Sequence, residues 1–139
     1  MDEINIMLDE GAFPPARIFP EDAGMDLFTP KDVTIKPGSY TVIDTGVHFE
    51  IPAGYVGMLK SKSGLNVKHD IVGEGVIDAG YTGSVVAKLY NHGKAVKRFE
   101  RGDKIIQIVI MPIVTPKPKV VKEFSQTKRG NGGFGSTGK

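Results

Sequence analysis

The apolar residues of this chain recur at every second position, in short runs that end at glycine, proline or aspartate. The segment TGVHFEIPAG puts Val47, Phe49 and Ile51 on one side of the backbone and ends at Pro52 to Gly54. The segment SVVAKLYN, from residue 84 to residue 91, alternates in the same way. Because successive side chains of a strand point to opposite faces, this period predicts half-buried β-strands. With short apolar runs elsewhere, it predicts an all-β sandwich or barrel.

One segment breaks this pattern. The stretch SKSGLNVKHD, from Ser61 to Asp70, is suited to a helix of about two turns. Ser61 or Ser63 stands where a side-chain oxygen would cap the first backbone N–H groups. We therefore expect a single short helix among the strands.

The segment KIIQIVIMPIV is apolar on both faces. Its two faces carry Ile106, Ile108 and Ile110 on one side, and Ile105, Val109 and Met111 on the other. Such a strand needs cover on both sides. Gln107 is the single polar residue among them, and a buried amide without a partner costs about 1–3 kcal/mol. Gln107 is therefore either a core amide bound to neighbouring backbone or a polar group that faces a ligand or a subunit interface.

The composition excludes several functions. Eighteen basic residues against sixteen acidic ones give a net charge of +2, which does not suit bulk binding of nucleic acid. The chain contains no cysteine, which excludes disulfides, thiol nucleophiles and cysteine-based zinc sites. The three histidines lack the spacing of metal ligands, so we expect each to be at the surface or hydrogen-bonded: His48, His69 and His92.

The sequence also predicts where the protein works. The first residues, MDEINIMLDEGAF, are acidic where a signal peptide needs basic residues, and no apolar run reaches membrane-spanning length. We expect a cytoplasmic protein with no membrane partner.

The chain ends in a glycine-rich segment, GNGGFGSTGK, which matches all but the last residue of a phosphate-binding P-loop. It lacks the Ser or Thr that would hold magnesium, and no helix follows it, so the match fails. It is either a disordered tail or a segment that wraps an anion. We expect one β domain at residues 1–126 and an arm at residues 127–139 outside the core.

Taken singly, the remaining polar segments have ordinary explanations. Asp26 suits a turn or an edge strand, and Lys62 a solvated surface. Asp78 and Tyr81 flank Ala79-Gly80 and indicate the turn of a β-hairpin. The Arg-Gly-Asp sequence at 101–103 indicates a turn before a strand rather than an adhesion motif.

Together and in this order, these segments resemble the five motifs of the trimeric dUTP pyrophosphatase (dUTPase) family. They are AGMDL (23–27), SKSGL (61–65), GVIDAGYTG (75–83), RGDKIIQ (101–107) and RGNGGFGSTG (129–138). The resemblance covers most of the chain. It implies a distorted β jelly roll that assembles as a homotrimer, with active sites shared between subunits.

The same resemblance implies hydrolysis of dUTP to dUMP and pyrophosphate, which limits uracil incorporation into DNA and supplies dUMP. Asp78 matches the carboxylate that activates the attacking water, and Tyr81 the ring that excludes a 2′-hydroxyl. The backbone that reads uracil falls within residues 73–77, and we assign substrate binding there to Gly73, Val76 and Ile77.

The other motifs carry the residues that would bind the charged triphosphate. The resemblance implies Mg²⁺ as cofactor, contacted by Asp26 through water, and phosphate binding by four residues: Lys62, Ser63, Gly64 and Gln107. It also implies that the arm closes over the nucleotide with Phe134 stacked on uracil and with further contacts from Arg129, Gly135, Ser136 and Thr137.

This chain departs from the family at two motifs. The second usually reads Pro-Arg-Ser where Ser61-Lys62-Ser63 stands, and lysine lacks the planar fork of arginine. In the third, an acidic residue and an arginine are common at the positions of Gly80 and Thr82. Two alternatives stay open: a dCTP deaminase of the same fold, for which Glu74 would be the acting glutamate, and a non-catalytic nucleotide sensor.

Overall fold

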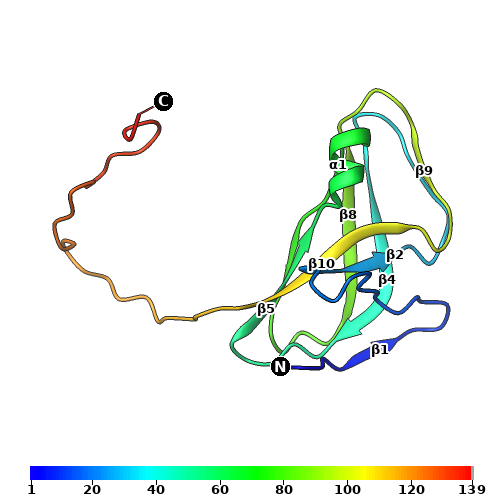
Figure 1. The fold of residues 1–139 in the computed structure, drawn as a ribbon, viewed down its shortest axis with the longest axis horizontal. Coiled ribbons are helices and arrows are strands. Elements are labelled where there is room, and N and C mark those ends of the chain that lie inside the picture. The colour runs from blue at the N-terminus through cyan, green and yellow to red at the C-terminus, as the bar shows by residue number, and fades with distance from the viewer. Residues whose placement is uncertain (139) are drawn as a thin grey trace.

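The computed structural model describes residues 1–138 and confirms an all-β chain with one short helix (Figure 1). The strands are β1 (Ile6–Leu8), β2 (Gly24–Phe28), β3 (Val33–Ile35), β4 (Tyr40–Phe49), β5 (Tyr55–Lys60), β6 (Ile71–Val72), β7 (Gly75–Ile77), β8 (Ser84–Asn91), β9 (Lys97–Phe99) and β10 (Lys104–Pro112). The helix, α1, spans Ser63–His69. Nowhere in residues 1–138 is there a helix long and apolar enough to cross a membrane.

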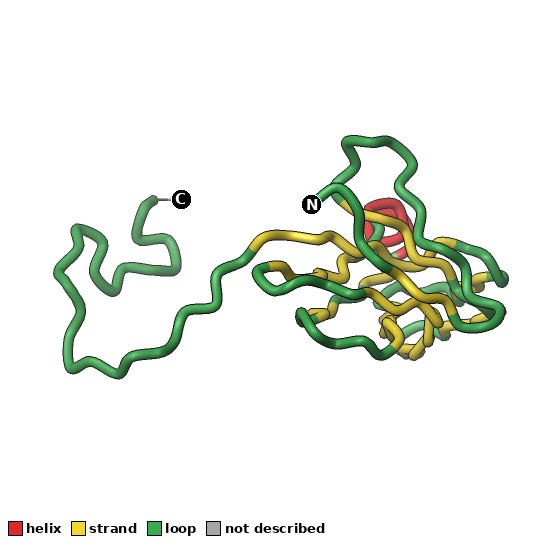
Figure 2. The backbone as a smooth tube through the Cα atoms, turned by 90° about the horizontal axis from the view of Figure 1, so that it is seen from below, coloured by secondary structure: helices red, strands yellow, loops and turns green. Residues whose placement is uncertain are grey.

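The strands form two main antiparallel sheets that enclose one core, in a jelly-roll-like arrangement (Figure 2). The first sheet has the order β1-β4-β8-β6 and the second β2-β10-β5-β7, while β3 and β9 form a separate pair. In the second sheet β7 lies at the edge and pairs only with β5, from Gly57↔Ile77 to Leu59↔Gly75. The sheet edge at β7 therefore carries residues of the third motif.

The alternation read from the sequence describes the core strands correctly. In β8 the side chains of Val85, Ala87 and Leu89 are buried while those between them are not. Val47 and Phe49 are buried on β4, the neighbouring strand of the same sheet. These side chains fill the space between the sheets, where burial of a large aliphatic or aromatic side chain contributes about 1.5–3 kcal/mol.

Strand β10 lies in the middle of its sheet, between β2 and β5. Ile106 and Ile108 are fully buried, as expected for its inner face. On the opposite face Val109 is half-buried and Met111 is exposed. Ile110, the last apolar residue of the inner face, is partly buried, so a single chain leaves the outer part of this strand incompletely covered on both faces.

The helix is confirmed, but its predicted cap is wrong. Lys62 is the N-cap residue, and no side chain makes a capping hydrogen bond. The hydroxyl of Ser61 instead binds the backbone of Gly73, and Ser63 is the first residue of the helix. A serine hydroxyl can satisfy only a few backbone groups, and here the tertiary partner replaces the local one.

Residues 113–138 form no helix or strand and lead away from the two sheets (Figures 1 and 2). The hydrogen bonds within residues 127–138 are local, such as Ser136 N–H to the Gly133 carbonyl at 3.2 Å. Lys139, the last residue of the predicted arm, lies outside the described residues.

Candidate active site

Asp78 lies in an exposed turn that connects β7 to β8. The Tyr81 N–H donates to the Asp78 carbonyl at 3.2 Å, and Gly80 has a φ of +86°, a conformation that glycine adopts without steric cost. The predicted hairpin is wrong, however. The strand before the turn, β7, pairs with β5, and the strand after it, β8, pairs with β4 and β6. The turn therefore crosses from one sheet to the other.

Tyr81 is held in place by its neighbours. Its hydroxyl donates to the Ser84 carbonyl at 2.9 Å. The side chain also lies across Gly83, where an added Cβ would stand 2.4 Å from the Tyr81 hydroxyl oxygen. Gly83 is thus required for the position of the tyrosine. Sequence analysis did not assign it a role, although its place two residues after Tyr81 in the third motif was a usable signal.

Four of the predicted site residues line one hollow. Val76, Ile77, Asp78 and Tyr81 surround it together with side chains at positions 84 and 86, and its volume is about 210 Å³. Pockets that enclose a small ligand are typically ~300–1,000 Å³. The hollow of a single chain is therefore smaller than a typical pocket that encloses a small ligand.

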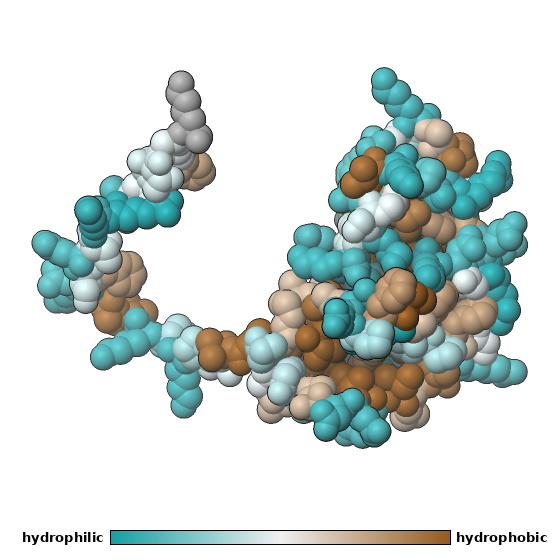
Figure 3. Space-filling view, in the orientation of Figure 1, coloured by the Kyte–Doolittle hydropathy of each residue, from teal (hydrophilic) through white to brown (hydrophobic). Residues whose placement is uncertain are grey.

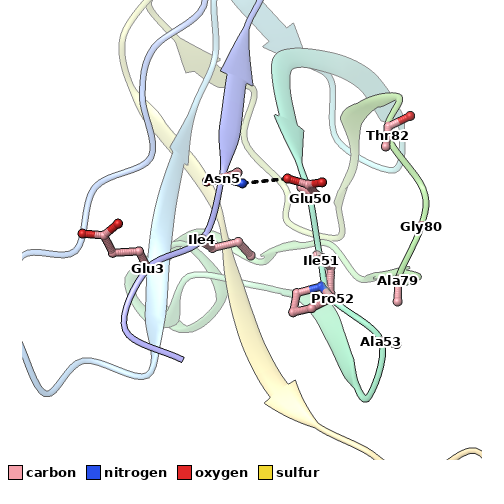
Figure 4. Close-up of a pocket in the computed structure, with 10 residues that line it drawn as sticks. All are labelled: Glu3, Ile4, Asn5, Glu50, Ile51, Pro52, Ala53, Ala79, Gly80 and Thr82. Carbon is pink, nitrogen blue, oxygen red and sulfur yellow. Dashed lines mark hydrogen bonds between the residues drawn. The ribbon is translucent and has the colours of Figure 1, made fainter.

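A larger hollow borders the same loop (Figure 4). It is lined by Ala79, Gly80 and Thr82 of the loop, and across from them by residues 3–5 and 50–53. Asn5 donates to Glu50 at 2.7 Å within it. Asp78 and Tyr81 are not among its lining residues.

Asp26 and Lys62, predicted separately from the first and second motifs, meet in the fold. Asp26 is only 6% exposed, and its Oδ1 atom pairs with the Lys62 ammonium. Its second oxygen, Oδ2, pairs with Lys104 at 3.3 Å. Both lysine side chains are partly exposed, whereas the Asp26 side chain is almost completely buried.

The sequence analysis did not predict Lys104 as a site residue, because a β-bulge changes the face of β10 on which its side chain lies. Strict alternation would put Lys104 and Gln107 on opposite faces of β10. The register shifts between Lys104 and Ile106, and both Ile105 and Ile106 are buried. The extra residue brings Lys104 to the same face as Asp26.

Gln107 lies beside this charge cluster, directly opposite Asp26 on β2. Its Nε2 group donates to the Ser61 carbonyl at 3.0 Å, which confirms that its amide is bound to neighbouring backbone. Gly24 makes room for the amide, since a Cβ there would stand 2.3 Å from the side-chain oxygen. The fold thus places Gln107, Asp26 and Lys62 together.

Three other residues predicted to contact the phosphates or the base differ in burial: Ser63, Gly64 and Gly73. Ser63 and Gly64 begin α1 and are both exposed. Gly73 is buried, and its N–H and carbonyl groups both bind the Ser61 hydroxyl. In this structure the backbone of Gly73 is engaged within the protein.

His48 connects the loop after β7 to the N-terminal segment. Its Nδ1 atom lies 2.7 Å from the Thr82 carbonyl and its Nε2 atom 2.9 Å from Asp9 Oδ1. The Thr82 carbonyl first, and then the Asp9 carboxylate, raise the pKa of His48 above its ordinary value, because both oxygens accept from a protonated ring. Asp44 acts in the same direction. The expectation of a hydrogen-bonded histidine is confirmed.

The predicted arm residues stay apart from both clusters. Arg129 donates from Nε to the Gly132 carbonyl at 2.7 Å, within the arm itself. Phe134 is fully exposed and has a φ of +50°, flanked by glycine on both sides. Gly135, Ser136 and Thr137 are exposed as well. In a single chain, residues 127–138 of the arm therefore contact neither the hollow at Asp78 nor the charge cluster at Asp26.

The comparisons agree with this arrangement. The dUTPase family model matches residues 12–138. A deoxyuridine 5′-triphosphate nucleotidohydrolase from Clostridium tetani is 43% identical over 136 residues, covering 96% of this chain and 94% of that protein. One from Mus musculus is 42% identical and covers 96% and 83%. The chain belongs to the dUTPase family.

Solved structures support the same assignment. The dUTPase of Staphylococcus bacteriophage 80alpha, solved with dUpNHpp, is 34% identical, has a TM-score of 0.94 and covers 99% of both chains. A mutant dUTPase from phage phi11 of S. aureus, described with a coordinated structural Mg(II) ion, is 34% identical, has a TM-score of 0.83 and covers 89% of this chain and 99% of that one.

Proposed function

We propose that this chain hydrolyses dUTP to dUMP and pyrophosphate, and so limits uracil incorporation into DNA and supplies dUMP. The observation that carries the proposal is the hollow in which Asp78 and Tyr81 lie beside Val76 and Ile77, at the edge of a sheet. The Asp78 carboxylate takes the proton of the water that attacks the α-phosphorus. General-base assistance of this kind contributes about 10²–10⁴ in rate.

The base and the sugar are read by different groups. As an edge strand, β7 leaves alternate backbone N–H and carbonyl groups unpaired by the sheet, and these can match the donors and acceptors of uracil. Tyr81 is anchored to Ser84 and seated on Gly83, so its ring forms a fixed wall. A wall in contact with the deoxyribose leaves no space for a 2′-hydroxyl.

The triphosphate meets the charge cluster. Asp26 is a single buried carboxylate paired with two lysines, and residues 1–138 hold no group of three or more metal-ligating side chains. This donor set suits an Mg²⁺ ion that arrives on the triphosphate with phosphate and water ligands, and that Asp26 contacts through water. The ion neutralises phosphate charge, while Lys62, Ser63, Gly64 and Gln107 bind the phosphate chain.

The site is completed by other copies of the chain, in a homotrimer with shared sites. Three observations support this proposal: the small volume of the hollow, the partly uncovered face of β10, and the apolar side chains of the segment after β10. That segment leads away from the body and shows apolar patches in Figure 3; its exposed members are Ile113, Val114, Val120, Val121 and Phe124. Such side chains need a partner surface.

In the assembled trimer the arm closes over the nucleotide. Phe134 stacks on uracil, and Arg129, Gly135, Ser136 and Thr137 bind the phosphates. Glycines at positions 130, 135 and 138 have positive φ, which lets backbone N–H groups approach phosphate oxygens. The domain limits of 1–126 and 127–139 and the cytoplasmic location expected from the sequence belong to the same proposal.

The dCTP deaminase alternative is not favoured. Glu74, its acting glutamate, is largely exposed and pairs with Lys60 at 3.5 Å. It is not among the residues that line the hollow at Asp78. The relatives from Clostridium tetani and Mus musculus are named nucleotidohydrolases, which favours hydrolysis over deamination.

Release of pyrophosphate from dUTP, dCTP, dTTP and UTP, each with and without Mg²⁺, tests the proposal. We expect steady turnover of dUTP alone, with strong dependence on Mg²⁺. Deoxyuridine nucleotides and ammonia formed from dCTP would identify a deaminase instead. Tight binding of dUTP without turnover would identify a sensor.

A further inference from the structure

Ser61 contacts two parts of the proposed site at once. It lies between β5 and α1, and its hydroxyl accepts from the Gly73 N–H at 3.0 Å and donates to the Gly73 carbonyl at 3.1 Å. Its own carbonyl accepts from Gln107 Nε2 at 3.0 Å. One residue is therefore bound both to the segment that precedes β7 and to the strand that carries Gln107.

The Ser61 hydroxyl continues the pairing of two strands beyond their backbone ladder. Strands β5 and β7 pair as far as Leu59↔Gly75. Ser61 and Gly73 each lie two residues further along, where the side chain takes over the role of a backbone donor and acceptor. The backbone N–H and carbonyl groups of the buried Gly73 are thereby both hydrogen-bonded.

Gly73 is also confined on its other side. A Cβ at this position would stand 2.8 Å from the Lys88 carbonyl oxygen and 2.9 Å from Leu89 Cδ2. The backbone of Gly73 is thus packed against β8 and held from the opposite side by Ser61. A segment held on both sides has little freedom to shift.

We propose that Ser61 is a positioning residue for base specificity, which it exerts by fixing residues 73–77 in the position that reads the base; this rests on the proposed function. Uracil and cytosine differ in the donor and acceptor groups that such a segment meets. Hydrogen bonds weaken steeply as their geometry worsens. A segment that can shift would accommodate both bases, whereas a fixed one rejects the base that leaves polar groups unpaired.

The test compares Ser61→Ala, Ser61→Thr and the control Ser39→Ala, an exposed serine at the start of β4. kcat/KM is measured for dUTP, dCTP and UTP. We expect Ser61→Ala to lower the dUTP:dCTP ratio roughly 5- to 10-fold, because both hydrogen bonds of the hydroxyl to Gly73 are lost and part of their free energy discriminates between the two bases. The dUTP:UTP ratio should stay unchanged, because it depends on Tyr81, whose contacts are with Ser84 and Gly83.

Several outcomes decide the matter. Ser61→Thr keeps the hydroxyl and should restore the dUTP:dCTP ratio, and hydrogen exchange of the Gly73 amide should be faster in Ser61→Ala than in the wild type. An unchanged dUTP:dCTP ratio in Ser61→Ala, or an equal fall in both ratios, overturns the inference. A wild-type enzyme that hydrolyses dUTP and dCTP equally would instead overturn the proposed base reading itself. Should Ser61→Ala not fold, Ser61→Cys, with its weaker hydrogen-bonding group, replaces it.

Discussion

The ammonium group of Lys62 pairs with Oδ1 of Asp26, so the second motif and the first motif meet at one buried carboxylate. Lys104 occupies the other oxygen at 3.3 Å. The residue proposed to face Mg²⁺ is thus held in place by two cations before any ligand arrives. These two ion pairs fix its orientation.

Asp26→Asn should impair both metal dependence and stability. We expect the Mg²⁺ concentration for half-maximal activity to rise about tenfold or more, because a neutral amide attracts the hydrated ion poorly. Loss of the carboxylate also leaves two ammonium groups close together. Because both are partly exposed, we expect a cost of about 1–2 kcal/mol rather than the ~3–5 kcal/mol of a fully buried pair. Asp2→Asn, on the exposed N-terminal segment, is the control. An unchanged Mg²⁺ dependence would contradict the role of Asp26.

Asp78→Asn should abolish turnover while nucleotide binding stays near normal. The amide keeps the shape of the side chain but cannot take the proton of the attacking water. We expect kcat to fall below about a tenth of the wild-type value, and far lower if the base supplies its usual 10²–10⁴. Affinity for a non-hydrolysable dUTP analogue, measured by calorimetry, checks the binding. Retention of more than a tenth of kcat would assign the base elsewhere.

Phe134→Ala should weaken substrate binding without affecting the free protein. The side chain is fully exposed in the single chain, so its loss removes no packing, and the melting temperature should not change. Stacking on a base contributes about 1–3 kcal/mol, which predicts a 5- to 150-fold rise in KM. Phe134→Tyr keeps an aromatic ring and should preserve KM. A loss of several degrees in melting temperature would place Phe134 in the core.

Mixed trimers test whether Asp78 and the arm of one site come from different chains. One parent is Asp78→Asn and the other is truncated after Gln126, and the two are refolded together in equal amounts. A site works only when its Asp78 comes from the truncated chain and its arm from the Asp78→Asn chain. These choices are independent in random assembly, so roughly one site in four should be active. Activity no higher than the sum of the parents would show that each site is built from one chain.

The ion pair of His48 predicts a pH dependence of stability. The folded pKa is raised above the unfolded value of about 6.5, so the bound proton stabilises the fold fully below that pH. This contribution is lost as the pH rises through the raised folded pKa. We expect the difference in melting temperature between the wild type and His48→Gln to be larger at pH 5.5 than at pH 8.5. Asp9→Asn should flatten the curve in the same way. Parallel curves for wild type and variant would show that the histidine proton does not stabilise the fold.

The sequence predicted the features that depend on local pattern. Val85, Ala87 and Leu89 are buried because alternation follows directly from the geometry of a strand. The ordered motifs likewise placed Asp78 and Tyr81 together, since four residues in a turn stay close in any fold.

What the sequence missed depends on contacts between distant segments. The hairpin prediction failed because β7 and β8 belong to different sheets. Strand β7 pairs with β5 and β8 pairs with β4, and the sequence of the turn does not determine these partners. Ser61 or Ser63 was expected to cap the helix, but neither does, and the Ser61 hydroxyl binds Gly73, twelve positions away. The role of Lys104 depends on a bulge that strict alternation cannot predict.

The position of β7 at the end of its sheet has a consequence for aggregation. An exposed strand edge is a template on which another chain can add a strand. In the proposed site, a pyrimidine bound along β7 occupies the place of that missing strand and so blocks the addition of another chain there. The nucleotide-bound protein should therefore resist edge-to-edge association better than the free protein. The substrate would then increase the solubility of the enzyme as well as react in its site.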